Sequence, residues 1–245
     1  MATDILSLEE VVAGYGKMTI LHGTSCTVAR GAITTVIGPN GAGKSTMFKT
    51  VFGMLPARSG RILFEGAEIT NLAPRDLLAR GISYVPQGRN IFPELSVRHN
   101  LELGAVMAPP GFDLSGRMDA AMARFPVLRR KADNQASTLS GGEQKMLEIA
   151  RALLLEPKLM LIDEPSIGLS PLMVNELFGL LAEMRDRGIT VLLIEQNAKR
   201  ALESSDHGIV LELGRTRIAD TAKNILADPR IGQLFLGGGL VEKVA

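Results

Sequence analysis

The stretch that decides the fold is Gly38-Pro39-Asn40-Gly41-Ala42-Gly43-Lys44-Ser45. It matches the pattern G-x-x-x-x-G-K-[ST], in which glycines let successive backbone N–H groups turn toward phosphate oxygens. A β-branched run at 33–37 precedes the loop, and an apolar helical stripe follows it from Lys44 to about Met54. Because strand, loop and helix come in this order, the sequence predicts an α/β nucleotide-binding fold. The alternative, a glycine-rich turn without a ligand, is disfavoured by this context.

The side chains at the end of the loop predict how a triphosphate is held. Lys44 brings a mobile positive charge to the β- and γ-phosphates, and Ser45 offers its hydroxyl to Mg²⁺. We therefore expect ATP and Mg²⁺ as cofactors. The predicted nucleotide-binding residues of this stretch are Gly38, Pro39, Asn40, Gly41, Ala42, Gly43, Lys44, Ser45 and Thr46.

A second chemical signal is the carboxylate pair Asp163-Glu164, which follows a continuous apolar run at 159–162. Such a run is typical of a parallel strand that is buried on both faces. Its carboxyl end is the place where open α/β sheets bind ligands. We expect Asp163 in the shell of the Mg²⁺ and Glu164 as the residue that polarises the water attacking the γ-phosphate. A solvated carboxylate pair at a strand end is the alternative.

A third signal is the turn Leu139-Ser140-Gly141-Gly142-Glu143-Gln144, which precedes an apolar helical pattern that Pro157 stops. Ser140 and the amides after it are expected at a helix N-terminus, where unpaired N–H groups and the helix dipole attract anions. Two interpretations carry equal weight for this turn. It is either a second phosphate contact that lacks a lysine or an ordinary Ser-Gly N-cap.

Length, composition and charge bound the class of protein. The chain has 245 residues, enough for one α/β domain or two small ones, and its formal net charge of +1 gives no electrostatic argument for nucleic acid. No window approaches the roughly 18 apolar residues of a membrane span, and the first residues lack the features of a signal peptide. The single Cys26 fits a reducing compartment, and His22, His99 and His207 are scattered. We therefore expect a soluble, cytoplasmic protein.

The remaining pattern places the other elements. Strand-like segments lie near 5–12 and 18–28, and a further pair near 60–69 turns at Gly66, which we interpret as an antiparallel edge. A short helix opens at Pro74, and a strand ends at Val85. After the carboxylate pair, Ser170 and Pro171 are the expected N-cap and first residue of a helix. A strand at 190–194, a helix from about Ala198 and a strand at 208–213 follow.

Strand signals disappear from about 88 to 152. Ser96 is suited to cap one helix there, and Met118, Met122 and Phe125 lie at helical spacing in another. These methionines suit either an adaptable binding surface or, more commonly, gaps in a core. We expect a single domain, 1–236, with a core at about 1–87 and 153–236, a helical subdomain at about 88–152, and a poorly ordered tail at 237–245.

Taken together, these elements resemble the ATP-binding cassette (ABC) ATPases over nearly the whole chain. Walker A is 38–45, the signature is 139–144 and Walker B is 159–164. The resemblance implies a P-loop NTPase fold of the α/β class, with a RecA-like core of mixed or parallel sheet, an antiparallel β edge and an inserted helical subdomain. It further implies that an ATP molecule is enclosed between Walker A of one cassette and the signature of another, contacted by Ser140, Gly141, Gly142 and Glu143.

Two further assignments rest on the same resemblance. Tyr15 is the aromatic residue that stacks on adenine, although a tyrosine at a strand end also has a plain structural explanation. Gln87 reaches Mg²⁺ and the attacking water, although alone it would be an ordinary loop residue. The metal site implied in this way consists of Ser45, Gln87 and Asp163.

The chain departs from the family pattern at two positions. Ser170 stands where most relatives carry a loop aspartate, and Gln196 stands where most carry a histidine that touches the γ-phosphate. Glutamine still donates a hydrogen bond to a phosphate oxygen, but it carries neither the proton nor the charge. We therefore group Gln196 with Glu164 as catalytic, with hydrolysis slower at this site as one consequence.

The phrases at 165–171, 195–198 and 236–238 look like those of the LivF-type subunits, which serve importers of branched-chain amino acids and of related amides and urea. This implies a second ATPase subunit in a homodimer or heterodimer, two transmembrane permease subunits contacted through the Gln87–Pro93 region, a periplasmic substrate-binding protein, and a place on the cytoplasmic face of the inner membrane. Competing hypotheses are an export cassette, a soluble clamp ATPase of DNA repair or translation, and a binding module without catalysis. The single cassette disfavours the clamp, and Glu164 disfavours the binding module.

Overall fold

The centre of the protein, in the computed structural model that describes residues 4–231, is a six-stranded sheet in the order β10-β9-β3-β8-β7-β6. Five of its strands run parallel: β3 (Ile33–Ile37), β6 (Ile82–Val85), β7 (Leu159–Asp163), β8 (Thr190–Ile194) and β9 (His207–Glu212). Parallel pairing brings the carboxyl ends of these strands to one edge. The phosphate loop, Gln87, the carboxylate pair and Gln196 all follow such ends, so the topology gathers them.

The inner parallel strands β3, β7 and β8 are buried at every residue, as the apolar run at 159–162 predicts for β7. All five residues of β7 are buried. Leu159 and Leu161 pack into one hydrophobic cluster, while Met160 and Ile162 pack into a second cluster on the other face. These two large clusters attach a different layer to each face of the sheet, and a third, smaller cluster packs α8 and α9 against Ile37 and Val210.

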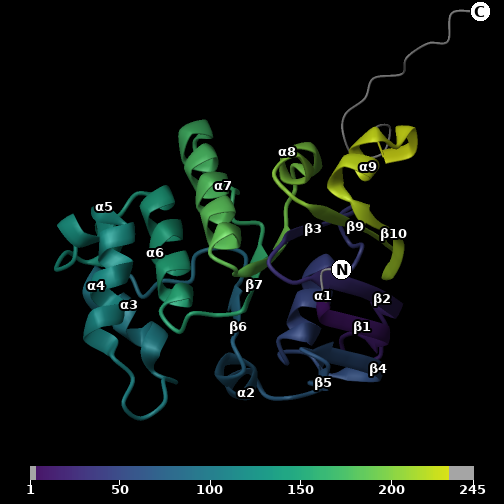
Figure 1. The fold of residues 1–245 in the computed structure, drawn as a ribbon, viewed down its shortest axis with the longest axis horizontal. Helices are drawn as coiled ribbons and strands as arrows, with labels where there is room; N and C mark the ends of the chain where they lie inside the picture. Colours follow the sequence, from purple (N-terminus) through teal and green to yellow (C-terminus); the bar gives the residue numbers. More distant parts are fainter. Residues whose placement is uncertain (1–3, 232–245) are drawn as a thin grey trace, which may run out of the picture.

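The layer on one face is a second, antiparallel sheet in the order β2-β1-β4-β5. Its strands are β1 (Asp4–Ala13), β2 (Leu21–Ala29), β4 (Ala57–Phe64) and β5 (Ala67–Glu68). Helix α1 (Lys44–Val51) contacts both sheets (Figure 1). Its Met47 and Phe48 lie fully buried in the hydrophobic cluster between them. It ends at Val51, earlier than predicted, since Gly53 turns the chain with φ +69°.

The predicted pair near 60–69 exists and turns at Gly66. It is the antiparallel edge β4-β5 of the second sheet. The antiparallel edge strand of the central sheet is β10 (Arg215–Thr221), which the sequence analysis did not predict. Its alternation is mostly polar and exposed, so it lacks a readable apolar pattern and depends on pairing with β9. The α/β fold class with a mixed sheet is confirmed.

Helices cover the other face of the central sheet and extend beyond it (Figure 1). The stretch 88–152 contains α3 (Val97–Glu102), α4 (Leu114–Arg124), α5 (Pro126–Arg130) and most of α6 (Gly141–Leu153), with short 3₁₀ turns at Leu103–Ala105 and Ala136–Thr138. Met118, Met122 and Phe125 are buried in the cluster on this side, which confirms the core interpretation of the methionines. The exact division into core and helical subdomain stays a prediction.

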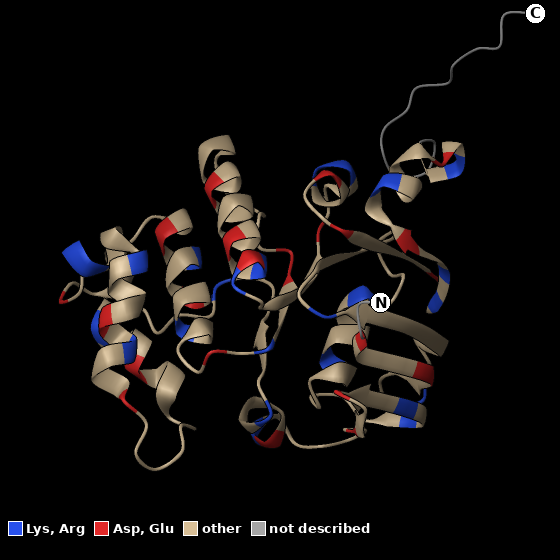
Figure 2. Ribbon diagram, viewed as in Figure 1, with Lys and Arg blue, Asp and Glu red and all other residues tan. Residues whose placement is uncertain are grey.

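The other helices are α2 (Pro74–Ala79), α7 (Pro171–Asp186), α8 (Ala198–Glu203) and α9 (Ala222–Ala227). Ser170 caps α7 through the amide of Met173, and Pro171 is its first residue, as predicted. The short α9 was not predicted, and the expected tail at 237–245 lies outside the described residues. Lys and Arg are interspersed with Asp and Glu on the helical part and on the core alike (Figure 2). No helix among residues 4–231 is long and apolar enough to cross a membrane.

Candidate nucleotide site

The phosphate loop connects β3 to α1 and takes a shape that its glycines permit. Gly41 and Gly43 have φ values of +80° and +101°, in the left-handed region that favours glycine. A Cβ on Gly43 would lie 2.9 Å from Cδ2 of Leu21, so a side chain there would press on the antiparallel sheet. Space is open beside Gly41, where a Cβ would meet no atom within 4 Å. The loop is thus tight on its inner side and open toward the cleft.

Lys44 bends back over this loop. Its Nζ donates hydrogen bonds to the backbone oxygens of Gly38 at 2.8 Å and Pro39 at 3.1 Å. The side chain is largely buried, and burial lowers its pKa, while the charges of Glu164 and Asp163 oppose that shift. Its ammonium group is therefore held at the loop.

A cleft of about 510 Å³ opens above the loop. It contains most of the predicted site: seven loop and helix residues, the two catalytic candidates and Gln87. Its lining is Ile20, Asn40, Gly41, Ala42, Gly43, Lys44, Ser45, Thr46, Gln87, Glu164, Ile167 and Gln196. Ile20 and Ile167 were not predicted, since single apolar residues in loops carry no sequence signal.

Asp163 ends β7 beneath this cleft with 1% of its surface exposed. Its Oδ2 lies 3.4 Å from the donating hydroxyl of Tyr84, while its buried Oδ1 has no hydrogen-bond partner among the described residues. Burial raises the pKa of Asp163, while the neighbouring hydroxyls of Ser45 and Tyr84 and the charge of Lys44 oppose the rise. An orphaned buried carboxylate oxygen next to Ser45 suits a hard divalent cation, so the residues present fit Mg²⁺.

Glu164 follows with a φ of +47°, a left-handed backbone that is unusual for a residue with a side chain. Its Oε2 accepts a hydrogen bond of 2.7 Å from Nε2 of Gln87. Burial raises the pKa of Glu164, the charge of Asp163 adds to the rise, and Lys44 opposes it. The structure therefore brings Gln87 and Glu164, distant in sequence, into direct contact.

Glu195 is the polar residue of this region that sequence reasoning missed. It directly follows β8, is 2% exposed, and accepts hydrogen bonds from Ser166 and from the backbone of Gln196. The available signal was its place after an apolar strand next to β7, the same signal that marked Asp163 and Glu164.

Tyr15 lies outside the residues that line the cleft. It is 46% exposed, and Nζ of Lys49 lies 5.9 Å from the centre of its ring. Arg58 anchors the turn that follows, through bonds from Nη2 to the oxygens of Gly16 at 2.9 Å and Met18 at 3.1 Å. The ring is therefore partly exposed, next to a turn that Arg58 holds.

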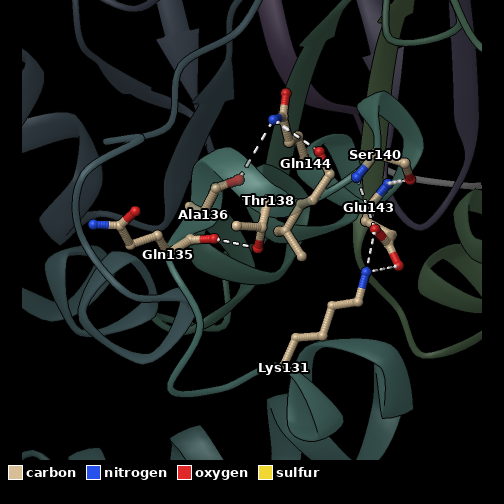
Figure 3. A network of polar contacts seen from close by, with 8 residues as sticks. Lys131, Gln135, Ala136, Thr138, Ser140, Glu143 and Gln144 are labelled. Atoms are coloured by element: carbon tan, nitrogen blue, oxygen red, sulfur yellow. Dashed lines mark hydrogen bonds and ion pairs between the residues drawn. The ribbon is translucent and has the colours of Figure 1, made fainter.

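The signature turn is also outside the cleft, at the start of α6 (Figure 3). Ser140 Oγ accepts from the amide of Glu143, and the amide of Ser140 donates to Glu143 Oε2 at 2.7 Å, which forms a capping box. Lys131 Nζ lies 2.8 Å from both oxygens of Glu143 (Figure 3). Although burial opposes it, Lys131 and Ser140 lower the pKa of Glu143. The N-cap interpretation is confirmed, and the phosphate interpretation stays a prediction.

A buried ion pair on α6 holds the segment after Gln87. Lys145 and Glu148 pair at 2.6 Å with little exposure. Lys145 also donates to the oxygen of Gly88 at 2.9 Å, and Glu148 accepts from the amide of Asn90. The signature helix and the Gln87 segment are therefore fastened together inside the protein.

Beside that segment runs a groove of about 630 Å³ with a largely apolar lining that includes Ile91, Phe92, Val106 and Met107. Phe92 is 52% exposed, and Val106 and Met107 are also exposed. Exposed apolar side chains gathered along one groove are typical of a surface that binds another protein.

Residues 21–167 match the family described as ABC transporter. This chain belongs to the ABC transporter family. It is 42% identical to the high-affinity branched-chain amino acid transport ATP-binding protein BraG of Pseudomonas aeruginosa, over 96% of this chain and all of the relative. It is 39% identical to the probable branched-chain amino acid transport ATP-binding protein LivF of Archaeoglobus fulgidus, over 92% of this chain and 95% of that one.

A lipopolysaccharide export ATP-binding protein, LptB of Escherichia coli, is 33% identical over 97% of this chain and 98% of its own. Among solved structures, the ADP conformation of MJ1267, an ATP-binding cassette of an ABC transporter, has a TM-score of 0.84 and 33% identity, with 96% of this chain and 99% of that chain covered. The chain is thus a nucleotide-binding ABC cassette with ATPase activity coupled to transport.

Proposed function

We propose that this cassette is the motor subunit of a bacterial importer whose cargo is branched-chain amino acids. Full-length similarity to BraG and LivF supports the cargo class. The cargo itself would not touch this subunit, so its residues do not distinguish branched-chain amino acids from other cargoes. Amides, urea and other amino acids are the less favoured cargoes of the same importer hypothesis. Similarity to LptB supports an exporter as the alternative.

The cleft supports ATP hydrolysis by a division of labour among its residues. The amides of the phosphate loop and Lys44 bind the phosphates, and Tyr15 stacks on adenine. Ser45, Gln87 and Asp163 would hold Mg²⁺, which would neutralise the charge that develops on the phosphates. Glu164, held by Gln87 at 2.7 Å, orients the attacking water and accepts its proton, and Gln196 donates a hydrogen bond to the γ-phosphate.

The signature turn acts on the ATP of a second cassette. Ser140, Gly141, Gly142 and Glu143 start a helix but do not line the cleft of their own chain. The N-terminus of a helix attracts anions, so the γ-phosphate of the partner cassette's ATP would bind at this turn and hold the two cassettes together. Hydrolysis removes that bridge and reopens the pair, in a homodimer or with a companion ATPase subunit.

The groove beside Gln87–Pro93 is the surface for the two permease subunits. Its exposed Phe92, Val106 and Met107 need an apolar partner, and Lys145 and Glu148 connect its wall to the signature helix. Opening and closing of the ATPase pair would reach the membrane through this connection. The complete system includes a periplasmic substrate-binding protein, and the cassette sits at the cytoplasmic face of the inner membrane.

The observation that carries this proposal is the contact between Gln87 and Glu164 above the phosphate loop, and Glu164→Gln tests it. We expect MgATP affinity to be retained and turnover to fall by about 10²–10⁴-fold, because the water loses its base. Glu176→Gln, an exposed site on α7, is the matched control and keeps full turnover. Near-normal hydrolysis by Glu164→Gln would contradict the catalytic assignment.

The cargo is tested by uptake into proteoliposomes that contain the assembled transporter and its binding protein. ATP-driven accumulation of leucine, isoleucine or valine supports the proposal. Uptake of amides or urea alone would correct the cargo, and ATP-driven release in place of uptake would favour the exporter.

A further inference from the structure

A buried carboxylate between the two loops that face the γ-phosphate has no role in the mechanism above. Glu195 is 2% exposed, and the ion pairs of residues 4–231 include none to it. Its three contacts are all hydrogen bonds that it accepts. Oε1 accepts from the amide of Ser166 at 3.0 Å, and Oε2 accepts from the Ser166 hydroxyl at 2.7 Å and from the amide of Gln196 at 3.2 Å.

Burying a carboxylate without a cation is costly, and only full hydrogen bonding offsets that cost. Burial raises the pKa of Glu195, although the bonds from Ser166 and Gln196 oppose the rise. A serine or an amide side chain at this position would accept fewer bonds. The hydrogen bonds of Glu195 therefore hold together the loop after β7, through Ser166, and the loop after β8, through Gln196.

What these bonds hold is a strained turn. Glu164 has a φ of +47°, and such a conformation persists only where its surroundings over-determine it. Two groups at the end of β8 grip the turn: the oxygen of Ile194 accepts from the amide of Glu164 at 2.9 Å, and Glu195 binds Ser166 two residues later. The next residue, Ile167, lines the cleft.

We propose that Glu195 is a positioning residue for hydrolysis, which fixes the turn that aims Glu164 and, through the backbone of Gln196, the side chain opposite it. The proposal rests on the roles given to Glu164 and Gln196 above. Glu195 touches neither the nucleotide nor the water in this scheme. It fixes the positions of Glu164 and Gln196, which contact the water and the nucleotide.

The test uses Glu195→Ala and Ser166→Ala in the full chain within its assembled transporter, with ATPase kinetics, MgATP affinity and thermal unfolding measured together. We expect kcat to fall by about 10–100-fold in Glu195→Ala, the range for a reacting group misplaced by about 1 Å, while KM for MgATP stays within roughly twofold. Ser166→Ala loses one bond and has a smaller loss of kcat in the same direction. Glu195→Gln retains one acceptor oxygen and gives an intermediate rate.

A residue that merely supports the fold would not act through Glu164, and a double-mutant cycle separates the two cases. In the Glu164→Gln background, Glu195→Ala should cause no further loss of turnover. Glu212→Ala, a partly exposed glutamate at the end of β9 that pairs with Arg217, is the matched control and keeps wild-type kinetics.

An unchanged kcat in Ser166→Ala and Glu195→Ala, a raised KM with constant kcat, or an equal loss of turnover in the Glu164→Gln background would each overturn the proposal. If Glu195→Ala does not fold, Ser166→Ala and Glu195→Gln decide alone. Glu164→Gln with normal turnover would instead overturn the proposed function, so the two failures are distinguishable.

Discussion

Two helices of this molecule begin at glycine-containing turns, and they use them differently. At α1 the N-cap is Gly43 in a left-handed conformation with no side-chain cap, and the first residues of the helix, Lys44 to Thr46, line the cleft. At α6 the N-cap is Ser140, and its capping box with Glu143 is reinforced by Lys131. The first start is left free for a ligand inside its own chain. The N-terminus of α6 is capped by its own side chains and lines no part of the cleft in its own chain.

This difference shows which part of the proposed nucleotide site a single chain supplies. Strand ends place Lys44, Asp163, Glu164, Gln87 and Gln196 around one cleft or directly beneath it. The signature turn belongs to the helical side of the same chain and lines no part of that cleft. Substitutions near the N-terminus of α1 should therefore change nucleotide binding within the chain, and substitutions at the N-terminus of α6 should change the pairing of two cassettes.

Lys44→Met removes the ammonium group at the N-terminus of α1, and we expect MgATP affinity to fall by about 100-fold or more. A charge-assisted hydrogen bond contributes about 1.5–3 kcal/mol, and 1.4 kcal/mol corresponds to a factor of ten. Titration with a fluorescent ATP analogue measures the affinity. Lys199→Met, on the exposed face of α8, is the control. Wild-type affinity in Lys44→Met would mean that the cleft is not the nucleotide site.

Gly141→Asp places a negative charge at the N-terminus of α6. We expect it to abolish the ATP-bridged pair of cassettes without unfolding the chain. A Cβ at Gly141 has room, with its nearest atom 4.0 Å away on Arg89, and an acidic residue in a first turn favours the helix. Opposite a partner's γ-phosphate, the same charge costs several kcal/mol.

Size-exclusion chromatography of the Glu164→Gln protein with MgATP measures this, alone or with the companion ATPase subunit. The control is Gly179→Asp, at an equally open position on α7, which should leave the pair intact. If Gly141→Asp pairs as well as its parent, the signature turn does not contact the partner's nucleotide.

Tyr15→Ala removes the proposed adenine contact, and we expect ATP affinity to fall by about 2–10-fold, since aromatic contacts contribute about 0.5–1.5 kcal/mol. Tyr15→Phe keeps the ring and should keep the affinity. Met18→Ala, exposed on the same loop, is the control. Equal affinities of the Ala and Phe variants would assign Tyr15 a purely structural role.

The smallest expected effect is a pH-dependent gain in stability from Glu164→Gln. Because the folded-state pKa of Glu164 is raised, its ionisation opposes folding at pH values above the unfolded pKa of about 4.3, and the cost vanishes below it. The variant should therefore melt at a higher temperature than wild type near pH 7.5 and at the same temperature near pH 4.

Glu65→Gln is the control of opposite sign. Hydrogen bonds from Lys158 and Arg30 lower the pKa of Glu65, so its ionised form favours folding above pH 4. That variant should melt at a lower temperature than wild type near neutral pH. A melting temperature of Glu164→Gln below wild type at pH 7.5 would show that its hydrogen bond with Gln87 outweighs its burial.

Local patterns in the chain carried most of the fold. The runs at 33–37, 159–162 and 190–194 consist of apolar and β-branched residues because both faces of a parallel strand are covered, and each forms such a strand. Ser140 and Ser170 were recognisable as N-caps because a cap depends on residues within one turn. Strand β10 was missed since its exposed, polar residues take their conformation from β9 rather than from their own pattern.

By itself the sequence determined the phosphate loop, the carboxylate pair and the helix starts, because their chemistry depends on neighbouring residues in the chain. The tertiary structure alone decided which of them meet. Gln87 bonds Glu164 and Glu195 bonds Ser166 because adjacent parallel strands end at one edge of the sheet. The signature turn lies apart from them, since it starts a helix that a separate hydrophobic cluster holds on the other face.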